Sequence, residues 1–222
     1  ENKALKSRRN KKFVSGNSLY NSYVSEQCKN IPTLQKLLVL ASDSKIDLDV
    51  ATIQLLVADC ALHLFISKNN LQTNEHNNVL LQFLLKELSI GEYDCLISDL
   101  IENTDFAISF CKKHPLLFNM EYIYEANEDV LGLIYISCKN IGNRKATGSY
   151  YTSTKVVKTL INKLNFQESQ KILDPCCGTG NFLLQLPEHI TFDSVYGNDI
   201  DTASVKITRL NMALKYNVPI SA

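Results

Sequence analysis

The residues best suited to bind a ligand form a short segment that contains two glycines, Asp174-Pro175-Cys176-Cys177-Gly178-Thr179-Gly180-Asn181-Phe182. It lies between a predicted strand and a predicted helix. Glycines at such a turn let the backbone bend tightly and approach a ligand, and the N-terminus of the following helix offers free N–H groups. We therefore expect a nucleotide-like ligand at this turn.

The spacing of the segment narrows the choice of ligand. The dinucleotide fingerprint needs a third glycine where Leu183 stands, and the phosphate loop needs a lysine that the segment lacks. An acid at the end of the strand, Asp174, suits a ligand with a cationic methionyl ammonium group, which is S-adenosylmethionine. A second acid, Asp199, ends the next predicted strand, where a carboxylate can accept both ribose hydroxyls. We expect Ile200 to pack on the adenine.

The elements that must position these residues alternate along the chain. Apolar runs predict strands at residues 171–174 and 194–199, and helical periodicity predicts helices from 181 to 186 and from 201 to 215. The order strand, helix, strand, helix predicts a parallel βαβα unit.

The preceding part of the chain has a helical pattern. Between residues 32 and 140 apolar residues recur at three- and four-residue spacing, which predicts an array of helices. We expect Asp47 or Asp49 to cap a long helix over residues 50–67, and the acid Asp129 to lie just before a helix over 131–138. Polar residues interrupt the long apolar stretch, so we expect a core helix and no membrane contact.

Charge and composition suggest three regions. The net charge is zero, but residues 1–12 carry a net charge of +5. We expect a basic flexible tail over 1–12, a helical N-terminal domain over 13–140, and the start of a cofactor-binding domain over 141–222. The tail could contact nucleic-acid phosphates or be merely solvated. The polar N-terminus is unlike a secretory signal, which predicts a cytoplasmic location.

The cysteines and histidines do not form a reactive set. Seven cysteines include no C-x-x-C pair, and four histidines stand apart from them and from one another. This pattern argues against a disulfide framework and against a metal site. We expect reduced thiols packed in the core, including Cys176 and Cys177.

Two motifs together resemble those of a known family. The glycine segment, extended to Leu183, resembles motif I of the amino-group DNA methyltransferases. Upstream, Thr147-Gly148-Ser149-Tyr150-Tyr151-Thr152-Ser153 resembles their motif X, and Asp129-Val130-Leu131-Gly132-Leu133-Ile134-Tyr135 is similar to the lead-in to it. In combination they look like the N6-adenine DNA methyltransferases of bacterial restriction-modification systems. The resemblance covers roughly residues 129–214.

The resemblance implies a fold and a set of cofactor contacts. It implies a helical N-terminal domain followed by an α/β Rossmann-like methyltransferase domain, of which the first βαβα is present. Tyr151 and Thr152 would line the methionyl end of S-adenosylmethionine. Asp174 and the backbone of Gly178 and Gly180 would hold its amino and carboxylate groups.

The remaining implied contacts lie further along the motif. Phe182 would pack below the loop, and Asp199 would bind the ribose. Three positions depart from the family pattern without touching an implied contact: Ser153 and Thr202 stand where proline is usual or frequent, and Cys176 stands where a small residue is usual.

The family's catalytic motif is absent from these 222 residues. Members transfer the methyl group at an Asn/Asp/Ser-Pro-Pro-aromatic tetrapeptide, which binds a flipped target base. The sequence contains no such tetrapeptide; Asn217-Val218-Pro219-Ile220 is not one. We expect it to follow residue 222 in the intact protein and expect the 222-residue chain alone to be inactive.

The expected function is methyl transfer from S-adenosylmethionine to adenine N6 in double-stranded DNA, with a specificity or restriction subunit as a possible partner. Three alternatives stay open. One is another Rossmann-like enzyme. The second is a non-catalytic helical docking and cofactor-binding module of a multisubunit complex. The third is a methyltransferase of the same fold that acts on RNA or protein.

Overall fold

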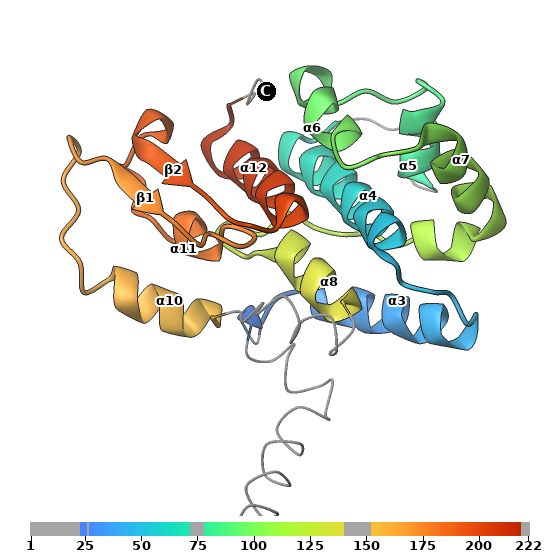
Figure 1. Ribbon diagram of the computed structural model, residues 1–222, viewed down its shortest axis with the longest axis horizontal. Coiled ribbons are helices and arrows are strands. Elements are labelled where there is room, and N and C mark those ends of the chain that lie inside the picture. Colours follow the sequence, from blue (N-terminus) through green and yellow to red (C-terminus); the bar gives the residue numbers. More distant parts are fainter. Residues whose placement is uncertain (1–22, 26, 72–77, 140–151, 219–222) are drawn as a thin grey trace, which may run out of the picture.

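The computed structural model describes residues 23–25, 27–71, 78–139 and 152–218, and this part is mostly helical (Figure 1). Its α-helices are α3 (Ile31–Asp43), α4 (Val50–Asn69), α5 (Val79–Leu84), α6 (Asp94–Ser98), α7 (Thr104–Lys113), α8 (Val130–Cys138), α10 (Thr154–Ile161), α11 (Asn181–Leu184) and α12 (Thr202–Tyr216). Short 3-10 helices lie at Gly91–Tyr93, Pro115–Phe118 and Phe192–Ser194. The strands are β1 (Ile172–Asp174) and β2 (Val195–Gly197).

The long helix α4 runs through the middle of the helical part. It begins as predicted at Asp49, whose side chain accepts a hydrogen bond from the Thr52 amide at 2.8 Å. Every residue from 52 to 66 is buried, as expected of a helix that is apolar on all sides. By length and composition alone α4 could cross a bilayer, but 78% of its apolar window is buried inside the molecule. It is the core helix that the sequence predicts.

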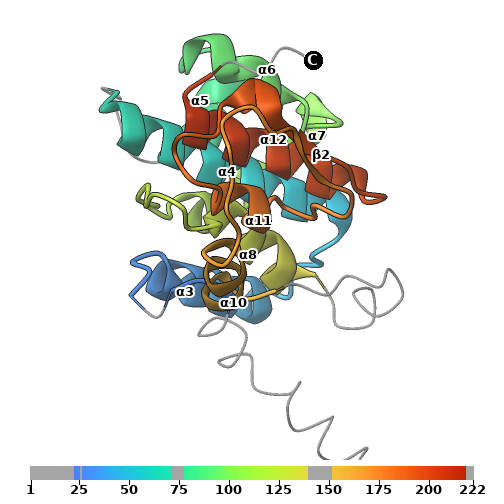
Figure 2. The same cartoon turned by 90° about the vertical axis from the view of Figure 1, so that its left-hand side faces the viewer.

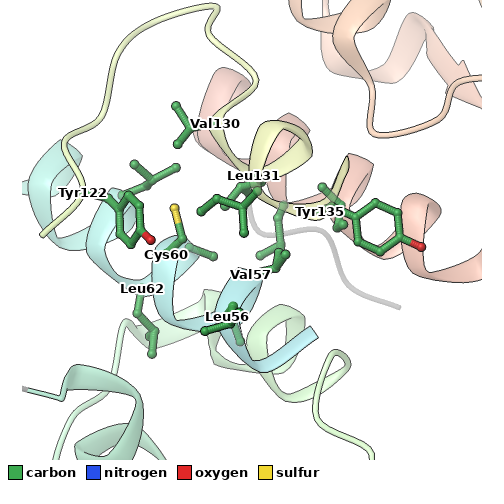
Figure 3. Packing of buried hydrophobic residues seen from close by; sticks show 14 of the residues in the cluster. Leu56, Val57, Cys60, Leu62, Tyr122, Val130, Leu131 and Tyr135 are labelled. Atoms are coloured by element: carbon green, nitrogen blue, oxygen red, sulfur yellow. The ribbon is translucent and has the colours of Figure 1, made fainter. Parts of the chain in front are cut away.

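Helix α8 packs directly against α4. Figure 3 shows Val57 and Cys60 of α4 beside Leu131 of α8, with Tyr122 covering the same cluster. All four side chains are almost completely buried. Close packing of this kind fixes the position of α8, because core side chains have little room to shift.

The C-terminal part contains the predicted alternation of strands and helices. Strands β1 and β2 pair in parallel, with Ile172 opposite Val195, so the parallel sheet is confirmed. Each strand is shorter than predicted. Helix α10 was not predicted; it is capped by Ser153, whose hydroxyl accepts from the Val156 amide at 3.4 Å.

Helix α12 belongs to both parts of the molecule. Figure 1 shows it between the sheet and α4. Ala203, Ile207 and Leu210 join the large core that is formed mainly by α3–α8, whereas Met212 joins a smaller core with Val157 of α10. The buried core therefore continues across the expected boundary near residue 141. Seen from the side of the sheet in Figure 2, α3, α8 and α10 form a lower level beneath α4 and α12, as they do in Figure 1.

The first turn of α8 is crowded. Asp129 precedes the helix, is completely buried, and accepts a hydrogen bond from the Gly132 amide at 2.8 Å. A Cβ atom on Gly132 would lie 2.1 Å from Asp129 Oδ2 and 2.3 Å from Thr179 Oγ1. No side chain larger than hydrogen fits at this position.

Replacing Gly132 with alanine should therefore destabilise the protein, although helix propensity alone predicts a gain of about 1 kcal/mol. We expect a loss of about 3 kcal/mol or more in the free energy of unfolding, because the new methyl group displaces a buried, hydrogen-bonded carboxylate. Urea unfolding measures it. In the same helix, Ser137→Ala removes a buried hydroxyl that has no hydrogen-bond partner among the described residues, and should be neutral or slightly stabilising. Equal or greater stability of Gly132→Ala would contradict the crowding.

Candidate cofactor-binding site

The glycine segment forms the turn between β1 and α11. Gly178 and Gly180 have φ angles of 53° and 91°, in the left-handed region that favours glycine. At Gly180 a Cβ atom would also lie 3.1 Å from Thr208 Cγ2 of α12. The two predicted glycines are thus required by backbone conformation, and the second also by close packing.

The residues that follow β2 form hydrogen bonds with this turn. The Cys177 amide donates to the Asn198 carbonyl at 2.9 Å, and the Asn198 amide donates to the Asp174 carbonyl at 2.9 Å. The Asp199 carboxylate accepts from the Gly178 amide at 2.8 Å through Oδ2 and from the Asp201 amide at 2.9 Å through Oδ1. The structure therefore brings Asp199 directly beside the glycine turn.

Two side chains of α12 form hydrogen bonds with the backbone of the turn. Thr208 donates its hydroxyl proton to the Gly178 carbonyl at 2.8 Å, and Asn211 donates to the Thr179 carbonyl at 2.8 Å. Both side chains are buried. The sequence showed α12 as a helix but contained no signal that these residues fasten the turn.

Thr152, one of the two residues of motif X within the described part, also contacts the segment that contains the turn. The Thr152 carbonyl accepts from the Asn181 side chain at 2.9 Å, and Thr154 donates to the amide oxygen of the same Asn181 at 3.1 Å. Asn181 is buried at the start of α11. Thr152 is therefore next to motif I, whereas Tyr151 lies outside the described residues.

The other predicted site residues differ in exposure. Asp174 and Asp199 are half-buried, and the Asp174 carboxylate accepts from the Cys176 amide at 3.1 Å. Ile200 is 94% exposed. Phe182 is half-buried and packs against the smaller core. Two acids and one open apolar side chain thus surround the turn at the carboxyl ends of parallel strands, where ligands of α/β folds bind.

The expectation that all seven cysteines are packed in the core is wrong for two of them. Cys95 and Cys176 are exposed, and the other five are buried. In the glycine segment Cys177 points inward; a Cβ on Gly197 would lie 3.1 Å from its sulfur. Cys176 lies in the turn that follows β1, and its side chain is exposed. Burial raises the pKa of the Cys177 thiol.

The buried acid Asp129 contacts the glycine turn. From the sequence it was predicted only to lie just before a helix. Asp129 Oδ2 accepts from Thr179 Oγ1 at 2.5 Å and from the Tyr23 hydroxyl at 2.5 Å. Its Oδ1 accepts from Asn211 at 2.7 Å and from the Gly132 amide. Burial raises the pKa of Asp129, and these hydrogen bonds oppose the rise. Its partners lie up to 106 residues away in the chain, so no local pattern could have identified them.

The turn between β2 and α12 is fastened by α8 as well. Asp201 caps α12 and accepts from Lys139 Nζ and from the Tyr135 hydroxyl, each at 2.8 Å. Burial raises the pKa of Asp201, but the hydrogen bonds and the charge of Lys139 lower it by more, so the pKa lies below its usual value. The Asp201 amide in turn holds Asp199.

Two strand-end carboxylates thus lie beside a glycine turn, an arrangement typical of ligand sites in α/β folds. The comparisons with known proteins agree. The family model of the N-6 DNA methylases matches residues 126–218. This range contains the glycine turn, both strands and α8.

Curated relatives are named as restriction-modification methylases. The chain is 27% identical to the type I restriction enzyme HindI methylase subunit of Haemophilus influenzae over 108 residues, which are 44% of the chain and 24% of that protein. It is 25% identical to the MjaIX methylase subunit of Methanocaldococcus jannaschii over 125 residues, 52% of the chain and 22% of that subunit. It is 28% identical to the type II methyltransferase M.VspI of a Vibrio species over 96 residues, 42% of the chain and 24% of that enzyme.

The aligned part of the chain thus spans about a quarter of the length of these relatives. No solved structure matches the chain. The family match and the relatives confirm the resemblance found in motifs I and X, which is to the N6 DNA methyltransferases of restriction-modification systems.

The Asp201 contacts predict a dependence of stability on pH. Because the pKa of Asp201 is lower in the folded chain than in the unfolded chain, its stabilising contribution is complete above about pH 4 and is lost as the pH falls through the folded pKa. We expect Asp201→Asn to cost about 1–2 kcal/mol at pH 7 and clearly less at pH 3. Urea unfolding at the two pH values measures the difference.

The matched control is Asp43→Asn, which changes an exposed carboxylate at the end of α3. Its effect should be small at both pH values. If the cost of Asp201→Asn were the same at pH 3 as at pH 7, the ion pair with Lys139 would not stabilise the folded chain.

Proposed function

We propose that this chain carries the S-adenosylmethionine site of an adenine-N6 DNA methyltransferase of a restriction-modification system. The observation that carries the proposal is the position of the Asp199 carboxylate beside the glycine turn, 2.8 Å from the Gly178 amide. A carboxylate offers about four lone-pair positions, and contacts within the described residues use two of them. Two remain for a pair of ribose hydroxyls.

The other residues of the site fit the same cofactor. We assign the methionyl end to Tyr151 and Thr152, and the amino and carboxylate groups to Asp174 with the backbone of Gly178 and Gly180. The carboxylate of Asp174 favours a cationic amine over a phosphate, because opposite charges attract and like charges repel. When bound, S-adenosylmethionine would supply the methyl group.

The adenine and the fold are assigned in the same way. Ile200 follows Asp199 directly and is 94% exposed, so its apolar surface is available to an adenine ring. Phe182 supports the turn from the smaller core. The parallel pair β1–β2, with α11 between the strands in sequence and α12 after them, supports a Rossmann-like domain over residues 141–222. We place a helical domain over 13–140 before it and, from the charge of the sequence alone, a basic tail over 1–12.

The expected partners follow from the relatives. Two of them are named as methylase subunits of type I restriction enzymes. We therefore propose double-stranded DNA as the substrate and a specificity or restriction subunit as the partner, in the cytoplasm and without membrane contact. Adenine as the target base rests on the resemblance of motifs I and X.

A second candidate is a non-catalytic module that binds the cofactor and docks within a multisubunit complex. This candidate stays open because these 222 residues contain no Pro-Pro-aromatic tetrapeptide. The two candidates differ in whether the intact protein holds a target base, since both share the cofactor site.

The ribose assignment predicts a loss of cofactor affinity. Asp199→Ala should weaken S-adenosylmethionine binding by about 1.5–3 kcal/mol, the range for hydrogen bonds to a charged group. Isothermal titration calorimetry measures it. The control Asp193→Ala removes an exposed carboxylate in the 3-10 helix before β2 and should bind normally. Equal affinity of Asp199→Ala and the wild type would remove the ribose role.

The missing tetrapeptide predicts that the 222-residue chain binds the cofactor without transferring its methyl group. Tritiated S-adenosylmethionine and adenine-rich duplex DNA provide the test, and we expect no tritium in the DNA above background. An intact relative with the tetrapeptide serves as the positive control. Turnover by this chain would mean that the residues holding the target amine lie within it.

A further inference from the structure

Helix α8 touches both loops of the candidate site. At its start, Asp129 contacts Thr179 in the glycine turn. At its end, Tyr135 and Lys139 bind Asp201, whose amide holds the Asp199 carboxylate. A single helix that packs closely on α4 therefore contacts both the turn after β1 and the turn after β2.

The contacts of Asp129 exceed what a helix cap needs. Capping α8 uses one bond, from the Gly132 amide to Oδ1 at 2.8 Å. Serine or threonine could provide it without burying a charge. Asp129 is completely buried and accepts three more bonds, from Tyr23, Thr179 and Asn211. Burying a carboxylate is costly unless it is fully hydrogen-bonded, so the additional bonds indicate an additional role.

The two acids of the site differ in what their oxygens can still do. All four lone-pair positions of Asp129 are filled, two on each oxygen, and its side chain has no access to solvent. Asp199 is half-buried and retains free positions. Asp199 can therefore bind a ligand, whereas Asp129 can act only through the residues that it holds.

The bond from Thr179 fixes the backbone of the glycine turn. Thr179 stands between Gly178 and Gly180, the two residues in left-handed conformations, and its side chain is 1% exposed. Glycines make this turn intrinsically flexible. Anchoring the one side chain between them selects a single conformation, and Asn211 reinforces it by binding both the Thr179 carbonyl and Asp129.

We propose that Asp129 is a positioning residue for the cofactor: through Thr179 it holds the glycine turn in the conformation that receives the amino and carboxylate groups of S-adenosylmethionine. The inference rests on the proposed function. It means that the helical part, through Tyr23 and α8, contributes to cofactor binding indirectly, by holding the glycine turn. A turn that is already ordered loses less conformational entropy when the ligand binds.

The test removes the anchoring hydroxyl while keeping the shape of the side chain. Thr179→Val should weaken S-adenosylmethionine binding about tenfold, as expected for the loss of one hydrogen bond to a charged group. Thr179→Ser, which keeps the hydroxyl, should restore most of the affinity. Calorimetry measures the affinity, and hydrogen exchange at the Gly178 and Gly180 amides should be faster in Thr179→Val and recover in Thr179→Ser.

The control separates positioning from general stability. Asp59 is also a buried carboxylate, in α4, and burial raises its pKa, but within the described residues it forms no hydrogen bond with the glycine turn. Asp59→Asn should alter the melting temperature and leave the cofactor affinity within about twofold of the wild type. A fall in affinity that merely tracks melting temperature across all the variants would overturn the positioning role.

The remaining outcomes are distinct. If the wild type binds S-adenosylmethionine and Thr179→Val binds it equally well, the positioning role is wrong and the proposed function stands. If the wild type itself does not bind S-adenosylmethionine, the cofactor site is wrong and the positioning role falls with it.

Discussion

A carboxylate without access to water is stable only when hydrogen-bond donors surround it, and Asp129 obtains its donors from four separate parts of the chain. Tyr23 comes from the N-terminal segment, Gly132 from α8, Thr179 from the glycine turn and Asn211 from α12. Each partner can satisfy the acid only when its own element is in place. The four contacts of Asp129 therefore fix the positions of the helical part, the glycine turn and α12 relative to one another.

A partly buried carboxylate, Asp201, has the same effect at the other end of α8. Asp201 is partly accessible, and Lys139 compensates its charge at 2.8 Å. This ion pair fixes the turn after β2, while the buried acid fixes the turn after β1. Because both anchors lie on one helix, the distance between the two turns is set by a rigid element and not by the short strands. A two-stranded sheet of three residues per strand would be a weak spacer by itself.

Local patterns in the sequence predicted several of the local features correctly. The long apolar stretch with its three- and four-residue spacing indicated α4, and Gly178 and Gly180 indicated a turn that the left-handed φ angles confirm. Helix α10 was missed because it is only eight residues long and carries exposed apolar residues, Val156 and Leu160, on its outer side. The anchoring of the turn could not be predicted, since the partners of Asp129 are distant in sequence and hydrogen-bonding residues have no periodicity. The roles of the site residues stay predictions.

Helix α12 contributes residues to both cores, and this has a consequence for how the protein folds. Residues 203–214 of this helix complete a core whose other members begin near residue 23 and include α4 at residues 50–69. Contacts this far apart in sequence require the closure of a long loop and form slowly compared with the helices themselves. During synthesis, the face of α4 that α12 covers stays open until residue 214 has been made. The apolar centre of the helical part is thus completed only by a segment made after α4 and both strands, and the two parts are expected to gain and lose their structure together.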